Sequence, residues 1–408
     1  MKPSVSDRKI ELQLPEQNEL AQYQRAEAAR GVRLSPACML AVALFFLFWG
    51  SLFFTVPYNE WSFSPAWILD HVRQQFRNFY LFLGGRFPSY SIHISQLLGV
   101  LLVGAALATT GAVFQGSFRN VLAGPSTMGV MAGGSMGCLL YVLFFTESTI
   151  TAVNVTADLT EYYSRSFFET YTQQLCVLLG CFAAVALVLL VALAAGRGRV
   201  SSSAMILSGT VLSTLTSNAM MVVQYYIIAK DPLDSRIDAI ADLMMGSFDN
   251  ITTILDVVLM AVPIGACLVI CLAVSGRLNL LSLGEEEATA MGLNVRRYRY
   301  LMIIVGTVLT AVVVAFCGHI GFLGFMIPLV GRKLAGPDMR KLLPCSMLLG
   351  AVLMLLVYDV AYITNLTGYL NLFTSSIGSI VMVITIFGRK GGGGNAAYQT
   401  TGQARMGF

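Results

Sequence analysis

Few residues of this sequence could perform chemistry, and their spacing argues against a catalytic or metal site. The three histidines, His71, His93 and His319, are far apart in the chain. Cys267 and Cys271 would share one face of a helix, but no His, Asp or Glu accompanies them, so we interpret them as packing residues. The sequence also lacks the G-x-x-x-x-G-K-[ST] loop that binds nucleotide phosphates. We therefore expect no catalytic residue, no metal site and no cofactor in this chain.

One short segment has the residue types of a docking helix. Glu285, Glu286 and Glu287 follow Gly284, and Gly292 comes five residues after the last of them. Carboxylates in a first helical turn are favoured by the helix dipole, and a glycine just after the last turn is a common helix end. The segment predicts a short exposed helix, which either docks into a groove of a partner protein or is an ordinary surface helix.

The composition places these residues in a membrane protein. Of the 408 residues, 56% are hydrophobic and 12% are charged, the mean hydropathy is +0.71, and the formal net charge is +4. A soluble domain carries about 25% charged residues, so this chain has too little polar surface to cover a soluble globule. The same figures argue against a nucleic-acid-binding protein and against a disordered chain.

The apolar runs predict an all-α polytopic membrane protein with about ten transmembrane helices, at about 20 residues per span. The runs lie at about 38–57, 93–113, 127–145, 171–195, 204–228, 252–275, 300–317, 320–331, 342–358 and 374–387. Gly129, Gly133 and Gly137 form a stripe of small residues on the third run. We interpret this stripe as a surface for close helix packing, with a substrate-lining role as the alternative.

The basic residues predict how the chain is oriented in the membrane. If the N-terminus is cytoplasmic, twenty of the 26 Lys and Arg residues face the cytoplasm. The six exceptions are Arg73, Arg77, Arg86, Arg165, Lys230 and Arg236. We therefore expect cytoplasmic N- and C-termini, with an N-terminal tail over residues 1–36, a transmembrane domain over residues 37–388 and a flexible Gly-rich tail over residues 389–408.

The predicted spans carry almost no charge, which bears on the source of energy. No Asp, Glu, Lys or Arg lies in the middle of an apolar run, and Asp256 falls in a first turn. Ion-coupled secondary carriers usually hold their ion with an intramembrane ionisable group, although backbone carbonyls at broken helices can replace it. An ion-coupled carrier is therefore disfavoured, and a transporter of this kind would need energy from a partner. A non-transporting membrane scaffold is the other alternative.

Three segments are similar in order and spacing to the motifs of one family. The matching residues are Gln115, Asn120, Leu122, Ala123, Pro125 and Gly129, then Leu283, Gly284, Ala288 and Gly292, then Gly318, Ile320, Gly321, Phe322, Gly324, Pro328 and Arg332, with Asp338, Arg340, Leu342, Leu343 and Pro344 as a sequel. They resemble the FecCD-type permeases, the membrane subunits of ABC importers for iron-siderophores, haem and vitamin B12. The likeness extends over about residues 38–388, and His319 stands where the family has a proline.

The resemblance implies a permease subunit of an importer in the cell (inner) membrane. It implies a second permease subunit in a homo- or heterodimer, a cytoplasmic ATP-binding-cassette ATPase that holds ATP and Mg, and an extracytoplasmic substrate-binding protein. The chain itself would not be an enzyme, and the cargo would be an iron-siderophore, haem or corrinoid.

The resemblance also assigns roles to residues. The ATPase-coupling helix would comprise Gly284, Glu285, Glu286, Glu287, Ala288, Met291, Gly292 and Leu293. The translocation-path or gating segments would contain Gln115, Asn120, Pro125, Gly129, Gly321, Gly324 and Pro328.

The expected docking site for the binding protein departs from the family pattern. The family's external Arg-x-Pro-Arg reads Arg86-Phe-Pro-Ser89 here, so one of two arginines is missing. Arg73 and Arg77 are four residues apart and would share one face of a helix. We expect docking at Arg86, with Arg73 and Arg77 either replacing the missing arginine or acting as solvated charges.

Overall fold

The structure is a computed structural model that describes residues 35–53, 73, 77, 88–145, 167–196, 201–231, 236–364 and 366–387. Its helices are α2 (Pro36–Phe53), α4 (Pro88–Phe118), α5 (Val130–Phe144), α7 (Phe167–Ala195), α8 (Ser202–Lys230), α9 (Arg236–Met245), α10 (Ile254–Leu283), α11 (Glu285–Ala290), α12 (Val295–Cys317), α13 (Leu323–Ala335), α14 (Met339–Ile363), the 3-10 helix η1 (Thr367–Tyr369) and α15 (Leu370–Phe387). No strand occurs within these ranges, and the expected all-α class is confirmed.

Seven of the described helices are long and apolar enough to cross a membrane, namely α4, α7, α8, α10, α12, α14 and η1 with α15. Two shorter apolar helices, α2 and α5, coincide with the first and third predicted runs. The Gly- and Pro-containing eighth run forms α13, which has 13 residues. Each predicted run therefore corresponds to a helix, while the orientation of the termini stays a prediction.

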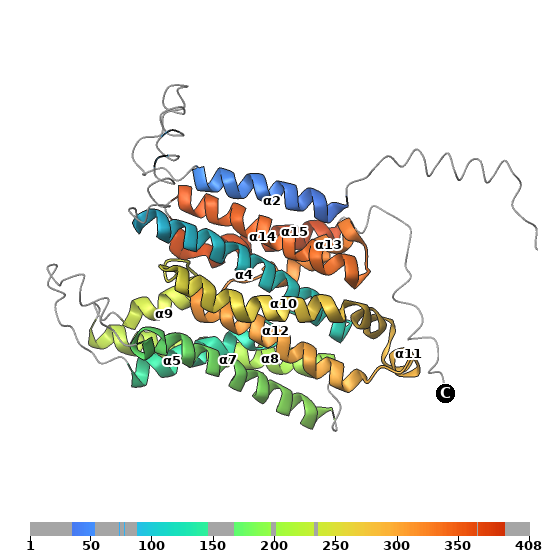
Figure 1. Ribbon diagram of the computed structural model, residues 1–408. Coiled ribbons are helices and arrows are strands. Elements are labelled where there is room, and N and C mark those ends of the chain that lie inside the picture. Colours follow the sequence, from blue (N-terminus) through green and yellow to red (C-terminus); the bar gives the residue numbers. More distant parts are fainter. Residues whose placement is uncertain are drawn as a thin grey trace, which may run out of the picture.

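The helices α4 and α12 form the centre of the bundle (Figure 1). In the most apolar 18-residue stretch of each of these two helices, 78% is buried. The corresponding share is 17% in α8 and in the span that ends with α15. Helix α4 contacts α10, α12, α13 and α14, while α5 packs mainly against α7 and α8. The faces of α8 and α15 are thus left for lipid or for another subunit.

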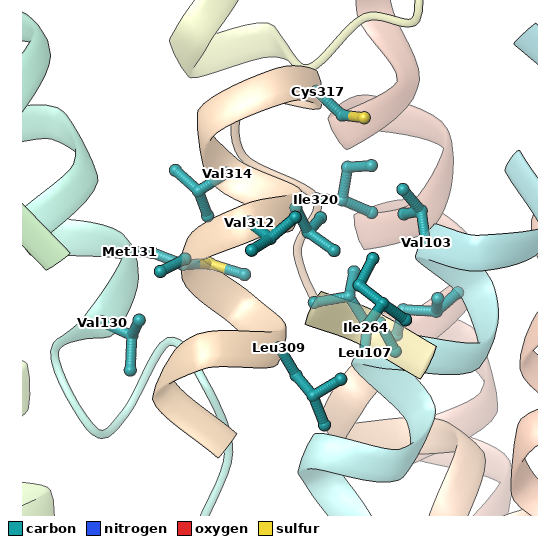
Figure 2. Packing of buried hydrophobic residues seen from close by; sticks show 14 of the residues in the cluster. Val103, Leu107, Val130, Met131, Ile264, Leu309, Val312, Val314, Cys317 and Ile320 are labelled. Atoms are coloured by element: carbon teal, nitrogen blue, oxygen red, sulfur yellow. The ribbon is translucent and has the colours of Figure 1, made fainter. Parts of the chain in front are cut away.

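Buried apolar side chains from several helices meet in one core (Figure 2). The residues labelled there are Val103 and Leu107 of α4, Val130 and Met131 of α5, Ile264 of α10, Leu309, Val312, Val314 and Cys317 of α12, and Ile320 in the loop that follows. All ten are buried. The α12 side chains reach towards both α4 and α5, so α12 joins the two halves of the bundle.

Glycines let the helix backbones touch where they cross. A Cβ atom at Gly104 would overlap the carbonyl oxygen of Gly350 in α14, and one at Gly111 would overlap that of Gly324 in α13. Gly133 and Gly137 of α5 lie in the same way against the α7 backbone. This confirms the packing interpretation for Gly133 and Gly137, since small residues allow the close approach that holds helices together in lipid.

Several helices extend beyond the apolar runs and include charged residues that the runs leave out. Arg332 lies in α13 and Asp359 lies in α14, where the runs end at 331 and 358. Asp359 Oδ1 accepts a hydrogen bond from Ser51 Oγ of α2 (2.5 Å). Both residues lie near the ends of their helices, so the expectation, which concerned only the middles of the spans, is not contradicted here. A hydrogen-bond partner offsets part of the cost of such a partly buried charge.

Candidate functional site

The predicted short helix is present as α11. Gly284, with φ 154°, separates it from the end of α10, and the Ala288 N–H donates to the Gly284 carbonyl (3.0 Å). After the helix, Gly292 adopts φ 82° and its N–H donates to Thr289 O (2.9 Å), while Leu293 N–H donates to Ala288 O (2.9 Å). A left-handed glycine with such backbone bonds closes a helix end, so α11 has the boundaries that the glycines predict.

Helix α11 has a buried inner side and an exposed acidic outer side. Ala288 and Leu293 are buried in a small cluster with Leu281 of α10, separate from the main core. The three glutamates are exposed, and Met291 is 52% exposed. The apolar cluster fixes the base of α11, and the acidic side is free to contact another protein.

An ion pair ties the first turn of α11 to the neighbouring transmembrane helices. Glu285 Oε1 lies 2.5 Å from Arg299 Nη2 in α12, and the Arg299 side chain is only 12% exposed. The Arg299 guanidinium also lies 5.9 Å from the ring centroid of Phe118 at the end of α4. A displacement of α11 would therefore act directly on α12 and α4.

A second cluster joins α4 to α13, and it contains residues from two of the family-like segments. Gln115 Nε2 donates to Phe325 O (3.0 Å), and Arg332 Nη1 donates to Gln115 Oε1 (2.6 Å). Gly324 lies against Leu107 and Pro125, and Gly111 meets the Gly324 backbone. We call Gln115, Gly324, Phe325 and Arg332 the α4–α13 junction. It brings together Gln115, Pro125 and Gly324, and Pro328 is buried one turn further along α13.

The other predicted path residues lie away from this junction. Asn120 Oδ1 accepts from Leu122 N–H (2.9 Å) and shapes the turn after α4. Gly129 caps α5 with φ 78° and lies against Gly209 of α8. Gly321 N–H donates to Asn371 Oδ1 of α15 (2.9 Å). These residues connect α4, α5, α8 and α15, and their role in gating stays a prediction.

His319, which departs from the family pattern, has a structural position between three elements. Its Nε2 lies 3.0 Å from both Ser135 Oγ and Met131 O of α5, and its N–H donates to Leu243 O of α9 (2.7 Å). The imidazole thus links the loop after α12 to α5, and the backbone N–H of His319 links the same loop to α9.

Asp338, which follows the third family-like segment, joins α10 to α14 through hydrogen bonds. Asn279 Nδ2 donates to Asp338 Oδ1 (2.6 Å), and Met339 N–H donates to Asn279 Oδ1 (2.7 Å). The Arg340 N–H also donates to Asp338 Oδ1 (2.9 Å), which makes Asp338 the N-cap of α14. The hydrogen bond from Asn279, followed by that from Arg340, lowers the pKa of Asp338.

The three arginines expected to dock the binding protein are only partly described. Arg73 and Arg77 are both helical and exposed, and their spacing places them on one helical face. Arg86 lies outside the described residues. The docking role of all three stays a prediction.

Sequence reasoning did not find the partners that hold these sites in place. No local sequence pattern marks the structural roles of Arg299, Asn279 and Asn371, because each contacts a residue outside its own helix. Among the described residues, no group of three or more His, Cys, Asp or Glu side chains could hold a metal ion.

Comparison with known proteins identifies the family. Residues 39–388 match the FecCD transport family. The chain belongs to this family. The molybdate import permease MolB of Haemophilus influenzae is 32% identical over 336 residues, which cover 82% of this chain and 88% of MolB. The cobalamin import permease BtuC of Halobacterium salinarum is 29% identical, over 71% of this chain and 70% of BtuC.

Further similarities agree with this membership. The Fe(3+)-citrate import permease YfmE of Bacillus subtilis is 28% identical, over 64% of this chain and 70% of YfmE. A solved structure of a metal-chelate type ABC transporter in an inward-facing conformation has a TM-score of 0.65 and 29% sequence identity, and covers 86% of this chain and 99% of its own. FecCD membership and the seven apolar helices make this chain a multi-pass protein of the cell (inner) membrane and a permease of the ABC importer class.

Proposed function

We propose that this chain is the transmembrane subunit of an ABC importer that carries an iron-siderophore, haem or corrinoid into the cytoplasm. ATP would be hydrolysed by a separate cytoplasmic ATPase, and an extracytoplasmic binding protein would deliver the cargo. The observation that carries the proposal is α11, a short helix with a fixed base, an exposed acidic side and an ion pair to α12. In this arrangement the chain transmits force and holds no ATP of its own.

These contacts support a transport cycle. Closure of the ATPase subunits would push on α11, and the Glu285–Arg299 ion pair would pass the displacement to α12 and to Phe118 of α4. Helices α8 and α15, which are mostly uncovered in this chain, would face the second permease subunit. A change in the angle at which these helices cross those of the second subunit would then open the path to one side of the membrane at a time.

The relatives limit the candidate cargoes, and the motif resemblance decides among them. Their names give molybdate, cobalamin and Fe(3+)-citrate as transported compounds. We favour an iron chelate, haem or corrinoid because of the motif resemblance, and molybdate is the competing cargo that an experiment must include.

Uptake by proteoliposomes tests this proposal. Vesicles would hold this chain, its ATPase and its binding protein, and would be offered a radiolabelled ferric siderophore, haem, cyanocobalamin or molybdate. We expect vanadate-sensitive uptake of one of the first three. A matched preparation with a Walker-lysine variant of the ATPase should show none. Uptake that persists without the ATPase but collapses with the proton gradient would instead identify an ion-coupled carrier, and ATP-driven uptake of molybdate alone would overturn the cargo assignment.

A further inference from the structure

A cavity lies beside the coupling helix, where four helices end or begin. Its volume is about 310 Å³, and it is lined by Phe118, Arg119, Ser201, Ser202, Glu285 and Arg299. This volume is at the lower end of the roughly 300–1,000 Å³ found for ligand sites. The lining comes from the end of α4, the start of α8, the first residue of α11 and the second turn of α12. We propose that this cavity binds a phosphate-type oxyanion.

Two serines line the cavity, and their hydroxyls are available to a ligand as far as the described residues show. Ser202 Oγ is buried and has no hydrogen-bond partner within the described part of the chain. Ser201 stands at the N-cap of α8 in extended backbone, but its side chain makes no capping hydrogen bond. A buried hydroxyl without a partner is costly, and an anion in the cavity would accept hydrogen bonds from both hydroxyls.

The charge of the lining favours an anion over a cation. Arg119 and Arg299 are positive and Glu285 is negative, and Glu285 is paired with Arg299. Arg119 makes no ion pair with any other described residue, so the lining as a whole is positive. Guanidinium groups bind phosphate oxygens in a fixed fork geometry. The N-terminus of the 29-residue helix α8 adds a partial positive charge at the same place.

Arg119 occupies a turn with an uncommon backbone conformation. Arg119 has φ 51°, a left-handed conformation that is uncommon for a residue other than glycine. It is the first residue after α4, where the chain turns towards α5. An anion bound there would lie beside both the turn after α4 and Glu285, the first residue of α11. Binding would therefore affect how firmly α11 is held, independently of which cargo is transported.

Two sources could provide this oxyanion, namely free inorganic phosphate and the phosphate of an anionic lipid headgroup. Basic cavities between transmembrane helices at the membrane boundary are known to hold anionic headgroups. The chemistry in the cavity is the same for both sources, so the experiment separates them.

The test uses the purified full-length chain in two arms. In detergent, equilibrium dialysis with radiolabelled inorganic phosphate measures binding of the free anion. In nanodiscs, native mass spectrometry compares the retention of phosphatidylglycerol with that of phosphatidylcholine. Arg119→Asn removes the guanidinium while keeping a residue that tolerates left-handed backbone. Ser202→Ala removes the hydroxyl without breaking a hydrogen bond, so the fold should be retained. Arg297→Gln is the control, since Arg297 is exposed on α12 and does not line the cavity.

We expect saturable binding of one phosphate, or selective retention of phosphatidylglycerol, by the wild-type chain and by Arg297→Gln. Arg119→Asn should weaken that binding at least tenfold, and Ser202→Ala should weaken it several-fold. Binding in the first arm alone identifies a free anion, and binding in the second arm alone identifies a lipid headgroup. The proposal is overturned if neither ligand binds, or if the two cavity variants bind as tightly as Arg297→Gln.

Discussion

The α4–α13 junction allows a quantitative prediction for Gln115→Leu. Gln115 is 3% exposed, and its amide both donates to Phe325 O and accepts from Arg332. Leucine has a similar size but can do neither. The substitution removes a hydrogen bond to a charged group, worth about 1.5–3 kcal/mol, and the additional hydrogen bond to the Phe325 carbonyl, worth about 0.5–1.5 kcal/mol.

Hydrogen bonds between membrane helices are weaker on average than these figures, at about 0.6 kcal/mol, because other partners are found in the unfolded state. The junction should lie above that average, since the Arg332 charge stays inside the bundle when its acceptor is lost. We therefore expect Gln115→Leu to lower the free energy of unfolding by about 2–4 kcal/mol. Reversible unfolding in mixed detergent micelles, followed by tryptophan fluorescence, measures this difference.

Gln174→Leu in α7 is the matched control. The Gln174 Oε1 atom is buried and has no hydrogen-bond partner in the described structure, so its removal should cost nothing or should stabilise the protein. The reasoning is refuted if Gln115→Leu is no more destabilising than Gln174→Leu. Gln115→Glu should retain more stability than Gln115→Leu, because a carboxylate still accepts from Arg332.

Three other predictions test packing, titration and the ion pair. Gly111→Ala should destabilise the bundle by several kcal/mol because its Cβ would overlap the Gly324 carbonyl, whereas Gly265→Ala in α10, where the Cβ meets nothing within 4 Å, should leave the midpoint unchanged or raise it in the same micelle assay. The lowered pKa of Asp338 stabilises the folded state. This contribution is complete above the unfolded pKa of about 3.9 and is lost as the pH falls through the pKa of the folded state. Asp338→Asn should therefore flatten the acid limb of a plot of stability against pH. The single substitutions Glu285→Arg and Arg299→Glu should each break the ion pair and reduce transport per ATP hydrolysed. The double variant, which restores the pair with reversed charges, should restore transport. Equal loss in the single and double variants would show that the pair does not transmit force.

The positions of the helices could be predicted because apolar runs and glycine boundaries are local signals. The span of α11 follows from Gly284 and Gly292 alone. The close packing of α5 follows from Gly133 and Gly137, but its partner α7 does not. The contacts that fix the site depend on helices that are distant in sequence.

Gln115 and Arg332 are 217 residues apart, and nothing near Gln115 indicates its partner. The contact of Asp359 could not be predicted for a related reason. Asp359 follows directly after an apolar run in the sequence, but α14 continues for another turn and places it beside Ser51 of α2. Motif resemblance brought Gln115 and Arg332 to attention without showing that they touch.

The central claim is that a partner ATPase grips α11, and copurification tests it most directly. The variant Glu286→Lys with Gly292→Trp reverses one exposed charge and places a bulky residue at the left-handed end of the helix. The tryptophan has room, since nothing lies within 4 Å, but it strains the backbone at φ 82° and so also disturbs the end of α11. Lys341→Glu is the control, because it changes an exposed charge at the start of α14. We predict that the ATPase copurifies with the wild-type chain and with the control, and is lost from the α11 variant, while all three chains elute from a sizing column as folded protein. Unchanged copurification and ATP-driven uptake in the α11 variant would contradict the account.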